Sequence, residues 1–315
     1  MQVVGGTAGW SYEDWVGPFY PIDPPKGFSR LAFYSGFFDC VEVNSTFYRH
    51  FPPWVAEKWL REVEFNERFV FLVKLHKSFT HGRTDEAKET SDDKAVVSEF
   101  LAPFVESGRL GGLLVQFSEY FRDNPAARDR ISSIIDGFAG IKLFLELRHS
   151  SWYTDKASEF IADRHVDVIA IDQPGLDGMV GLDPDVVGEV GYFRLHGRNR
   201  EMWELGRSSL ANKKSASGQA DLNEPGRNDR YNYLYSESDL DEIEAKIRKV
   251  GERCNRIYVV ANNHPMGKAV ANALELVRRL RNQERVRMPE TVIKYIPELE
   301  KVAEKVSVGP QDTLF

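Results

Sequence analysis

The sequence predicts an α/β fold, a single (β/α)8 TIM-type barrel, on the basis of three observations. Short runs rich in Val, Ile, Leu and Phe alternate with segments of helical periodicity. The short runs are apolar on both faces except near their ends, which is typical of buried parallel strands. The length of 315 residues accommodates one barrel of about 250 residues with additions, although length alone also allows two domains.

A strand followed by a helix is the repeating unit along the chain. We expect strands at 3–8, 41–44, 69–75, 112–117, 142–148, 167–172, 190–196 and 256–262. Helical spacing of apolar residues predicts helices that include 28–38, 93–107, 125–138, 238–250 and 267–281. A doubly wound open sheet is the second choice. The sequence contains neither GxGxxG nor GxxxxGK(S/T), so no nucleotide-cofactor motif supports that alternative.

Two segments fall outside the repeat. Residues 198–235 follow the seventh strand and are rich in Gly, Ser, Asn and charge, which predicts a long loop. This loop is either a solvated insertion or a lid packed over the barrel mouth through its aromatic residues. The barrel is assigned to 1–282, and 283–315 form an extension, expected to be helical at 298–306, with a tail ending in QDTLF.

Composition limits the class of protein. There are 41 Lys and Arg against 48 Asp and Glu, a net charge of −7, which argues against broad non-specific nucleic-acid binding but allows a local basic cleft. Cys40 and Cys254 lie far apart without a CxxC pattern, so we expect reduced structural thiols. No signal-peptide pattern and no long apolar run is present, so we expect a cytoplasmic protein that does not engage a membrane.

Polar and charged residues gather where the predicted strands end, and in a barrel these ends build the active site. The alternation of side chains along a strand places Glu42 with Asn44, and Glu146 with Arg148, on one face. The candidate residues at the strand ends are Glu42, Asn44, Lys74, Glu146, Arg148, His149, Asp172, Arg194, His196, Arg198, Asn262 and Asn263.

The residue types suggest three groups of roles. Catalytic acids or bases, or ligands of a divalent metal, would be Glu42, Glu146, Asp172 and His196. Substrate neutralisation would fall to Lys74, Arg148, His149, Arg194 and Arg198. Orientation of the substrate would fall to Asn44, Asn262 and Asn263.

Alternatives to these roles stay open. The charges could pair with one another across the barrel and serve stability alone, since a buried charge is costly unless it is paired. There is no HExxH, no Cys/His cluster and no tight ligand spacing, so the signal for a metal is weak, and a metal-free mechanism with a carboxylate or histidine as general base is the alternative.

The arginines favour an anionic, phosphate-bearing substrate. Arg194 and Arg198 flank the seventh strand, and Lys268 follows the eighth near an expected helix start. Barrels often bind phosphate at these loops, and helix N-termini attract anions. Lys268 is also compatible with an ordinary solvated surface charge.

Aromatic residues follow the glycine-rich end of the first strand. Trp10 and Tyr12 are expected to form a stacking wall for the substrate or, alternatively, a satellite core under the loops. There is no GxSxG elbow, and neither cysteine ends a strand, which argues against covalent Ser or Cys catalysis.

Several motifs in order resemble one known family. They are GTAGWSYEDWVGPFYP, VEVNSTFYR, TH at 80–81, LELRHSSW, YFRLHGR and ANNHPMGKAVANAL. Together they resemble the YecE-like family, the uncharacterised domain family numbered 72. The resemblance implies a TIM-type barrel but no established activity. Ala8 and Ala261 depart from residues common in the family, and neither departure removes a polar candidate.

The last five residues, QDTLF, resemble the Q-x-x-L-F peptide by which bacterial replication and repair proteins dock on the DNA sliding clamp. Leu314 and Phe315 would enter an apolar groove while Gln311 forms a hydrogen bond at its rim. A frayed tail, or one packed back on the barrel, is the alternative.

Two functions follow as hypotheses. The first is a hydrolase or lyase acting on an anionic, phosphate-bearing small substrate or on a nucleic-acid end. The second is a non-catalytic, repair-associated binding protein docked on the sliding clamp through QDTLF.

Overall fold

The structure is a computed structural model. It describes residues 1–81, 91–176, 178–182, 184, 186, 188–213 and 229–307.

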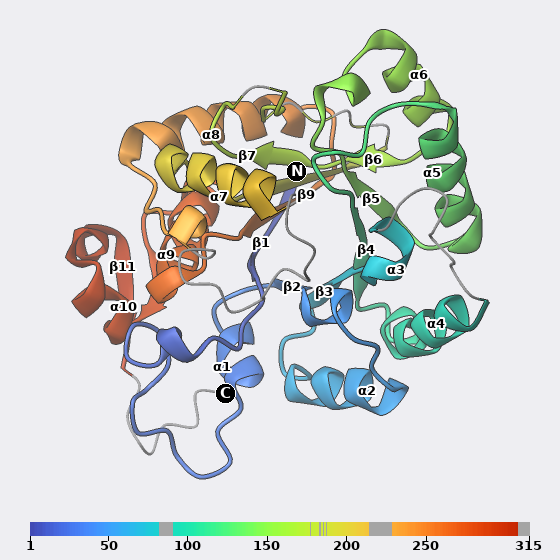
Figure 1. Ribbon diagram of the computed structural model, residues 1–315. Coiled ribbons are helices and arrows are strands. Elements are labelled where there is room, and N and C mark those ends of the chain that lie inside the picture. Colours follow the sequence, from blue (N-terminus) through green and yellow to red (C-terminus); the bar gives the residue numbers. More distant parts are fainter. Residues whose placement is uncertain are drawn as a thin grey trace.

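A parallel sheet curves into a barrel at the centre of the molecule (Figure 1). Its strands are β1 (Gln2–Ala8), β2 (Cys40–Val43), β3 (Val70–Lys74), β4 (Leu110–Gln116), β5 (Leu143–Glu146), β6 (Asp167–Val168), β7 (Ala170–Asp172), β8 (Val190–Leu195) and β9 (Arg256–Ala261). Neighbours follow the order β6-β5-β4-β3-β2-β1-β9-β8-β7. The prediction of a TIM-type barrel is therefore confirmed.

The barrel closes through one extended segment that serves two neighbours. β6 pairs with β5 and β7 pairs with β8. Ile169 lies between the two short strands, and its backbone N–H donates to the Leu145 carbonyl at 2.8 Å. β6 and β7 together therefore correspond to the single predicted strand 167–172.

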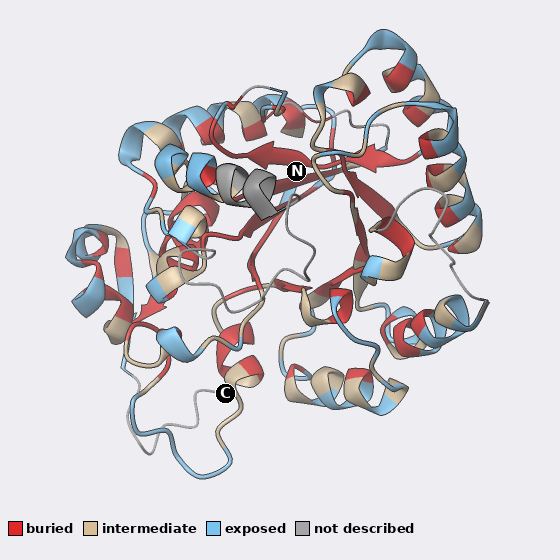
Figure 2. Ribbon diagram, in the orientation of Figure 1, coloured by how far each residue is buried: buried red, intermediate tan, exposed pale blue. Residues whose placement is uncertain are grey.

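Helices surround the barrel, with buried faces toward the strands and exposed faces outward (Figure 2). They are α1 (Arg30–Ser35), α2 (Pro53–Glu62), α3 (Lys77–Thr80), α4 (Ser91–Glu106), α5 (Pro125–Gly137), α6 (Asp155–Asp163), α7 (Arg200–Lys213), α8 (Glu237–Gly251), α9 (Lys268–Leu280) and α10 (Glu290–Tyr295). Their N-termini carry the expected signals: Asn124 and Thr154 cap α5 and α6, and Ser236 with Asp239 forms a capping box on α8.

The regular alternation of strand and helix fails in two places. Among the described residues between β7 and β8 there is no helix, so the sixth predicted β-α repeat lacks its helix there. Conversely, the segment predicted as a long loop, 198–235, contains α7 and the 3-10 helix η4 (Asp229–Tyr231). The glycine and serine content of the segment did not indicate that residues 200–213 form a helix in which Trp203 is buried.

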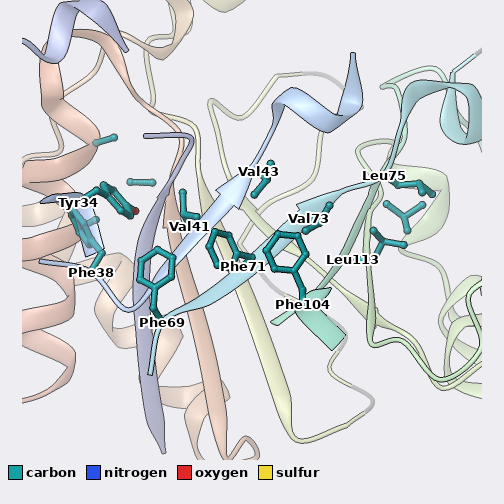
Figure 3. Packing of buried hydrophobic residues seen from close by; sticks show 14 of the residues in the cluster. Tyr34, Phe38, Val41, Val43, Phe69, Phe71, Val73, Leu75, Phe104 and Leu113 are labelled. Atoms are coloured by element: carbon teal, nitrogen blue, oxygen red, sulfur yellow. The ribbon is translucent and has the colours of Figure 1, made fainter. Parts of the chain in front are cut away.

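Two apolar layers hold the strands. One fills the space between strands and helices, where Val41, Val43, Phe71 and Val73 meet Phe104 (Figure 3). The other lies inside the barrel and is contributed by the alternate residues of the strands, Val4, Ala8, Cys40, Leu72, Leu114, Phe144, Ile169, Ile171, Tyr192, Tyr258 and Val260. The side-chain period of two separates the layers.

The C-terminal extension packs on the barrel. β10 (Val286–Pro289) and β11 (Ala303–Val306) form a parallel pair joined by α10 and the 3-10 helix η6 (Pro297–Val302). Met288 and Val292 belong to the main apolar cluster. The helix predicted over 298–306 is wrong in its second half, where β11 pairs with β10; isolated periodicity could not reveal that partner strand.

The cysteines and the absence of a long apolar run were also subjects of prediction. Cys40 and Cys254 are both free and buried, as predicted. No described helix is long and apolar enough to cross a bilayer.

Gly6 tests the packing inside β1. A methyl group there would collide with the Cys40 carbonyl oxygen and thiol on the adjacent strand. We expect Gly6→Ala to lower the free energy of unfolding by about 1–3 kcal/mol or more, because a strand cannot shift without breaking its pairing. Urea denaturation measures this. Gly175→Ala, with no neighbour within 4 Å, is the matched control, and equal effects of the two changes would contradict the close approach of β1 and β2.

Candidate functional site

The polar residues at the carboxyl end of the barrel continue its inner apolar layer. Cys40 is followed two residues later by Glu42, Leu72 by Lys74 and Tyr192 by Arg194. The same spacing carries Phe144 to Glu146. Because alternate residues share a face, these polar side chains form the next layer up inside the barrel.

Arg194 connects two strands on opposite sides of this layer. Its Nε donates to Glu42 Oε2 at 2.7 Å, and one of its terminal nitrogens donates to Glu42 Oε1 at 2.6 Å. Its other terminal nitrogen binds Glu146 Oε2 and also donates to Gln116 Oε1 at 3.2 Å. Burial disfavours the charge, but the two carboxylates outweigh it and hold the pKa of Arg194 well above its usual value.

Each carboxylate has a second partner. Tyr192 donates its hydroxyl to Glu42 Oε2 at 2.5 Å, and Arg148 Nε donates to Glu146 Oε1 at 2.6 Å. Desolvation opposes ionisation of Glu146, yet Arg148 and Arg194 hold its pKa far below the usual range. Glu146 is therefore a permanent carboxylate at neutral pH.

Lys74 is the contrasting cation of this layer. It is 7% exposed, and its Nζ lies 4.1 Å from the centre of the Phe47 ring. Its ammonium donates no hydrogen bond to any described residue. Burial, followed by the charge of Arg194, lowers the pKa of Lys74 to about 7.

His196 is neutral and oriented. Asn262 Nδ2 lies 2.7 Å from His196 Nδ1, and since an amide nitrogen only donates, Nδ1 accepts and Nε2 carries the proton. Complete burial, with Arg194 nearby, lowers the pKa of His196 well below its usual value. Nε2 is 3.9 Å from Glu146 Oε1 and has no hydrogen-bond partner among the described residues.

Part of the predicted lid covers His196. Trp203 of α7 and Tyr231 of η4 lie 6.2 Å and 5.8 Å from the imidazole, measured between ring centres. The Arg230 guanidinium is 5.1 Å from the Trp203 ring and 4.6 Å from the Tyr231 ring. In Figure 1, α7 lies between α8 and the centre of the barrel. The described part of 198–235 thus packs over the mouth.

Buried polar atoms without partners gather around this mouth. Within the described ranges, they include Asn44 Oδ1, His196 Nε2, Trp203 Nε1, Arg230 Nε, Asn263 Oδ1 and His264 Nδ1. An unsatisfied buried polar atom costs about 1–3 kcal/mol. A ligand or ordered water at this place would recover that cost, so the group marks a candidate binding site.

Asp172 and Arg198 belong to a different network. Ile171 faces the barrel interior, so Asp172 points the other way, toward Arg198 at 2.7 Å and the Tyr235 hydroxyl at 2.6 Å. Arg198 also binds Asp239 and Glu242. This network fixes the segment before α8. The prediction from sequence grouped Asp172 with Glu42 and Glu146 because all three end strands. It did not consider which residues of the strand 167–172 face the barrel interior.

Two other predicted residues also lie outside the inner layer, because each is one position out of step with the inward-facing residues of its strand. His149 caps the 3-10 helix η3 (Ser150–Trp152), where its Nδ1 accepts from the Ser151 backbone N–H at 3.1 Å. Asn263 donates to the Tyr233 carbonyl at 2.7 Å. Both contacts stabilise loops around the mouth rather than the inner layer.

The aromatic residues after β1 divide between the two expected roles. Trp10 packs edge-on against Trp59, with ring centres 5.1 Å apart, as a satellite core would. Tyr12 stacks on His264 at 4.5 Å and donates to the Ala8 carbonyl at 2.5 Å. Burial and the nearby Glu42 charge raise the pKa of Tyr12, so its phenol stays protonated.

The proposed metal ligands are not brought together. Glu42 and Glu146 bind Arg194, whereas Asp172 binds Arg198. Across the described ranges, no group of three or more His, Cys, Asp or Glu side chains is arranged to hold a metal ion. The donor set as placed therefore does not fit a divalent cation.

The prediction from sequence missed several site residues, because it took its polar candidates from the ends of predicted strands. Tyr192 lies inside a strand, and Trp203, Arg230 and Tyr231 lie in the segment predicted as a loop. The conspicuous aromatic residues of that segment were the available clue. The tail residues Gln311, Leu314 and Phe315 lie outside the described residues.

Replacement of Arg194 tests the inner layer. We expect Arg194→Met to lower the free energy of unfolding by about 3–5 kcal/mol at pH 7, because it leaves two carboxylates buried without their cation. Urea denaturation across pH measures this. Arg30→Met, which breaks the exposed pair with Glu13, should cost less than about 1 kcal/mol.

The pH dependence has a definite sign. The lowered pKa of Glu146 contributes stability above its ordinary value of 4.5, and this contribution is lost as pH falls through the native value. On acidification, the free energy of unfolding therefore falls more for the wild type than for Arg194→Met. The difference in stability between the two proteins narrows as pH falls. A gap that stays constant from pH 7 to the acid limit of folding would argue against the Glu146–Arg194 interaction.

The comparisons with known proteins agree with the fold. Residues 4–294 match the family described as "Protein of unknown function DUF72". The UPF0759 protein YunF of Bacillus subtilis is 27% identical over 289 residues, which cover 87% of this chain and 93% of that protein.

Solved structures give the same result. A DUF72 family protein from Thermotoga maritima has a TM-score of 0.73 and 28% identity, covering 89% of this chain and all of that one. One from Enterococcus faecalis has a TM-score of 0.71 at 22% identity, covering 89% of this chain and 96% of that one, and supports the fold alone. The chain belongs to the DUF72 family of proteins of unknown function.

Proposed function

We propose that this protein is an enzyme that binds a small anionic substrate at the carboxyl end of its barrel and acts on it as a lyase, with Lys74 as the reactive base. The observation that carries the proposal is the set of buried donors left without acceptors. They are His196 Nε2, Trp203 Nε1 and Arg230 Nε, counted against the described residues.

These donors belong to neighbouring side chains. Trp203 and Tyr231 both contact the His196 ring, and Arg230 lies against both aromatic rings. A carboxylate or phosphate oxygen is the acceptor that best matches two neutral N–H groups and a guanidinium. The lid segment would then close on the anion it binds.

The balance of charge supports an anion. The two carboxylates Glu42 and Glu146 are matched by Arg194 and Arg148. Lys74 adds positive charge whenever it is protonated, and Arg230 adds more at the mouth. The inner layer is thus neutral to positive before any ligand enters, which lowers the cost of burying an anion there.

The chemistry favours a lyase over a hydrolase. A hydrolase of the two-carboxylate type needs one protonated carboxylic acid, and Arg148 and Arg194 keep the pKa of Glu146 too low for this role. Lys74, with a pKa of about 7, is the group poised to accept a proton at neutral pH. Proton abstraction or addition by an amine is typical of carbon-bond cleavage.

The phosphate preference has narrower support. Arg198 is engaged by Asp172, Asp239 and Glu242, and Lys268 donates to Asn232 at 2.6 Å. The backbone N–H of Met266, before α9, donates to the Asp14 carboxylate. The loops after the last two strands are therefore already in use, so a single carboxylate or phosphate held by the lid donors is the ligand we propose.

Arg230 provides the test of anion binding. Isothermal titration calorimetry with phosphate, lactate and malonate should give binding to the wild type. Arg230→Met should weaken it by about tenfold to a hundredfold, the loss of one charge-assisted hydrogen bond of about 1.5–3 kcal/mol. Arg200→Met, on the same lid but paired outward with Glu204, should leave it unchanged. If none of the anions binds, or if both variants lose affinity alike, the proposal is overturned.

The non-catalytic alternative rests on the sequence QDTLF alone. If the tail docks on a DNA sliding clamp, Leu314→Ala with Phe315→Ala should abolish capture of the clamp in a pull-down, because the apolar anchors are lost. Arg230→Met should leave capture intact. Equal capture by the tail variant and the wild type would exclude docking through this peptide.

A further inference from the structure

We propose that the substrate is a short 2-oxo acid and that Lys74 Nζ forms an imine with its carbonyl carbon. This inference rests on the proposed function and names the substrate class of the same site. It joins two features that both border the Glu146–Arg194 pair: the buried Lys74 amine, which donates no hydrogen bond to a described residue, and a set of donors suited to a carboxylate.

The placement of Lys74 separates it from a structural lysine. Other well-anchored lysines are held in ion pairs, such as Lys142 with Asp167 and Lys305 with Glu300. Lys74 is nearly buried, yet its Nζ is matched only by the face of Phe47, 4.1 Å away, among the contacts of the described residues. Thr46 holds its backbone, donating to the Lys74 carbonyl at 2.6 Å. Its backbone is thus held in place, while its amine has no hydrogen-bond acceptor in the part of the chain that the structure describes and is available for reaction.

Charge neutralisation does not explain this lysine. Arg194 and Arg148 already balance Glu42 and Glu146, so the ammonium form is surplus in a desolvated layer. Burial and Arg194 lower the pKa of Lys74 to about 7, so a large fraction is neutral amine at physiological pH. The neutral form is the nucleophile.

The adjacent donors account for the acid group of the substrate. His196 carries its proton on Nε2, which lies 3.9 Å from Glu146 Oε1, and the imidazole ring packs near Trp203 and Tyr231 of the lid. In a 2-oxo acid the carboxylate is bonded directly to the carbonyl carbon. Lys74 and His196 both interact with the charges of Glu146 and Arg194, so a carboxylate held beside His196 would turn the adjacent carbonyl toward Lys74.

The step balances without a further reactant. The Nζ lone pair attacks the carbonyl carbon, and a proton passes from nitrogen to the former carbonyl oxygen, giving a carbinolamine. The C–O bond then breaks, and the hydroxyl leaves as water with the remaining N–H proton, giving the neutral imine. A proton taken from water, with hydroxide left behind, gives the protonated imine, which is the electron acceptor that a lyase needs.

Reductive trapping tests the inference. The full-length protein is incubated at pH 7 with pyruvate or glyoxylate and sodium cyanoborohydride, which reduces imines in preference to ketones. Peptide mass mapping then locates the secondary amine. We expect one adduct, on Lys74, and its loss in Lys74→Arg, which keeps the positive charge but cannot form the imine. Lys77→Met, an exposed lysine three residues away, should leave the Lys74 adduct unchanged.

A parallel titration with lactate separates the two proposals, because lactate has the carboxylate but no carbonyl. Lactate binding without any adduct from pyruvate or glyoxylate would overturn the imine and leave anion binding standing. Absence of both binding and adduct would overturn both proposals. Adducts spread evenly over surface lysines, or retained in Lys74→Arg, would also overturn the inference. Circular dichroism of Lys74→Arg confirms that a lost adduct reflects chemistry rather than unfolding.

Discussion

Inside the barrel, the guanidinium of Arg194 lies between Glu42 and Glu146, and the polar layer depends on this contact. A carboxylate buried without a cation would carry a large desolvation cost, and Arg194 offsets that cost for both residues. The planar fork of arginine satisfies Glu42 with two nitrogens and leaves a third for Glu146, which lysine could not do. Three further residues form hydrogen bonds with the members of this bridge: Tyr192 with Glu42, Gln116 with Arg194, and Arg148 with Glu146.

The bridge also gives the neighbouring groups their character. Burial, followed by the positive charge of Arg194, lowers the pKa values of Lys74 and His196. His196 is thereby kept neutral, and a large fraction of Lys74 is neutral, in the centre of the protein. One presents a lone pair and the other an N–H donor, so the same contact that stabilises the layer also prepares two different chemical functions.

Much of this was predictable from the sequence, and what was missed has a physical reason. Strand positions, and the shared face of Glu146 and Arg148, followed from apolar runs and a period of two. Asp172 was grouped with Glu42 and Glu146, whereas the structure places it beside Arg198, because Ile171 rather than Asp172 faces the barrel interior. The aromatic residues of 198–235 indicated packing over the mouth, but its Gly- and Ser-rich composition gave no sign of the helix α7.

The segment from Asp167 to Asp172 closes the barrel with few register pairs to its neighbouring strands. Two register pairs join β6 to β5 and three join β7 to β8, whereas six join β1 to β9. The two pairs between β5 and β6 are the fewest of any neighbouring strands in the described sheet, and no described helix follows β7 directly. Local opening is cheapest where contacts are fewest. The barrel wall is therefore least stable against local opening at the β5–β6 pairing. Backbone amides should exchange fastest with solvent there and slowest between β1 and β9.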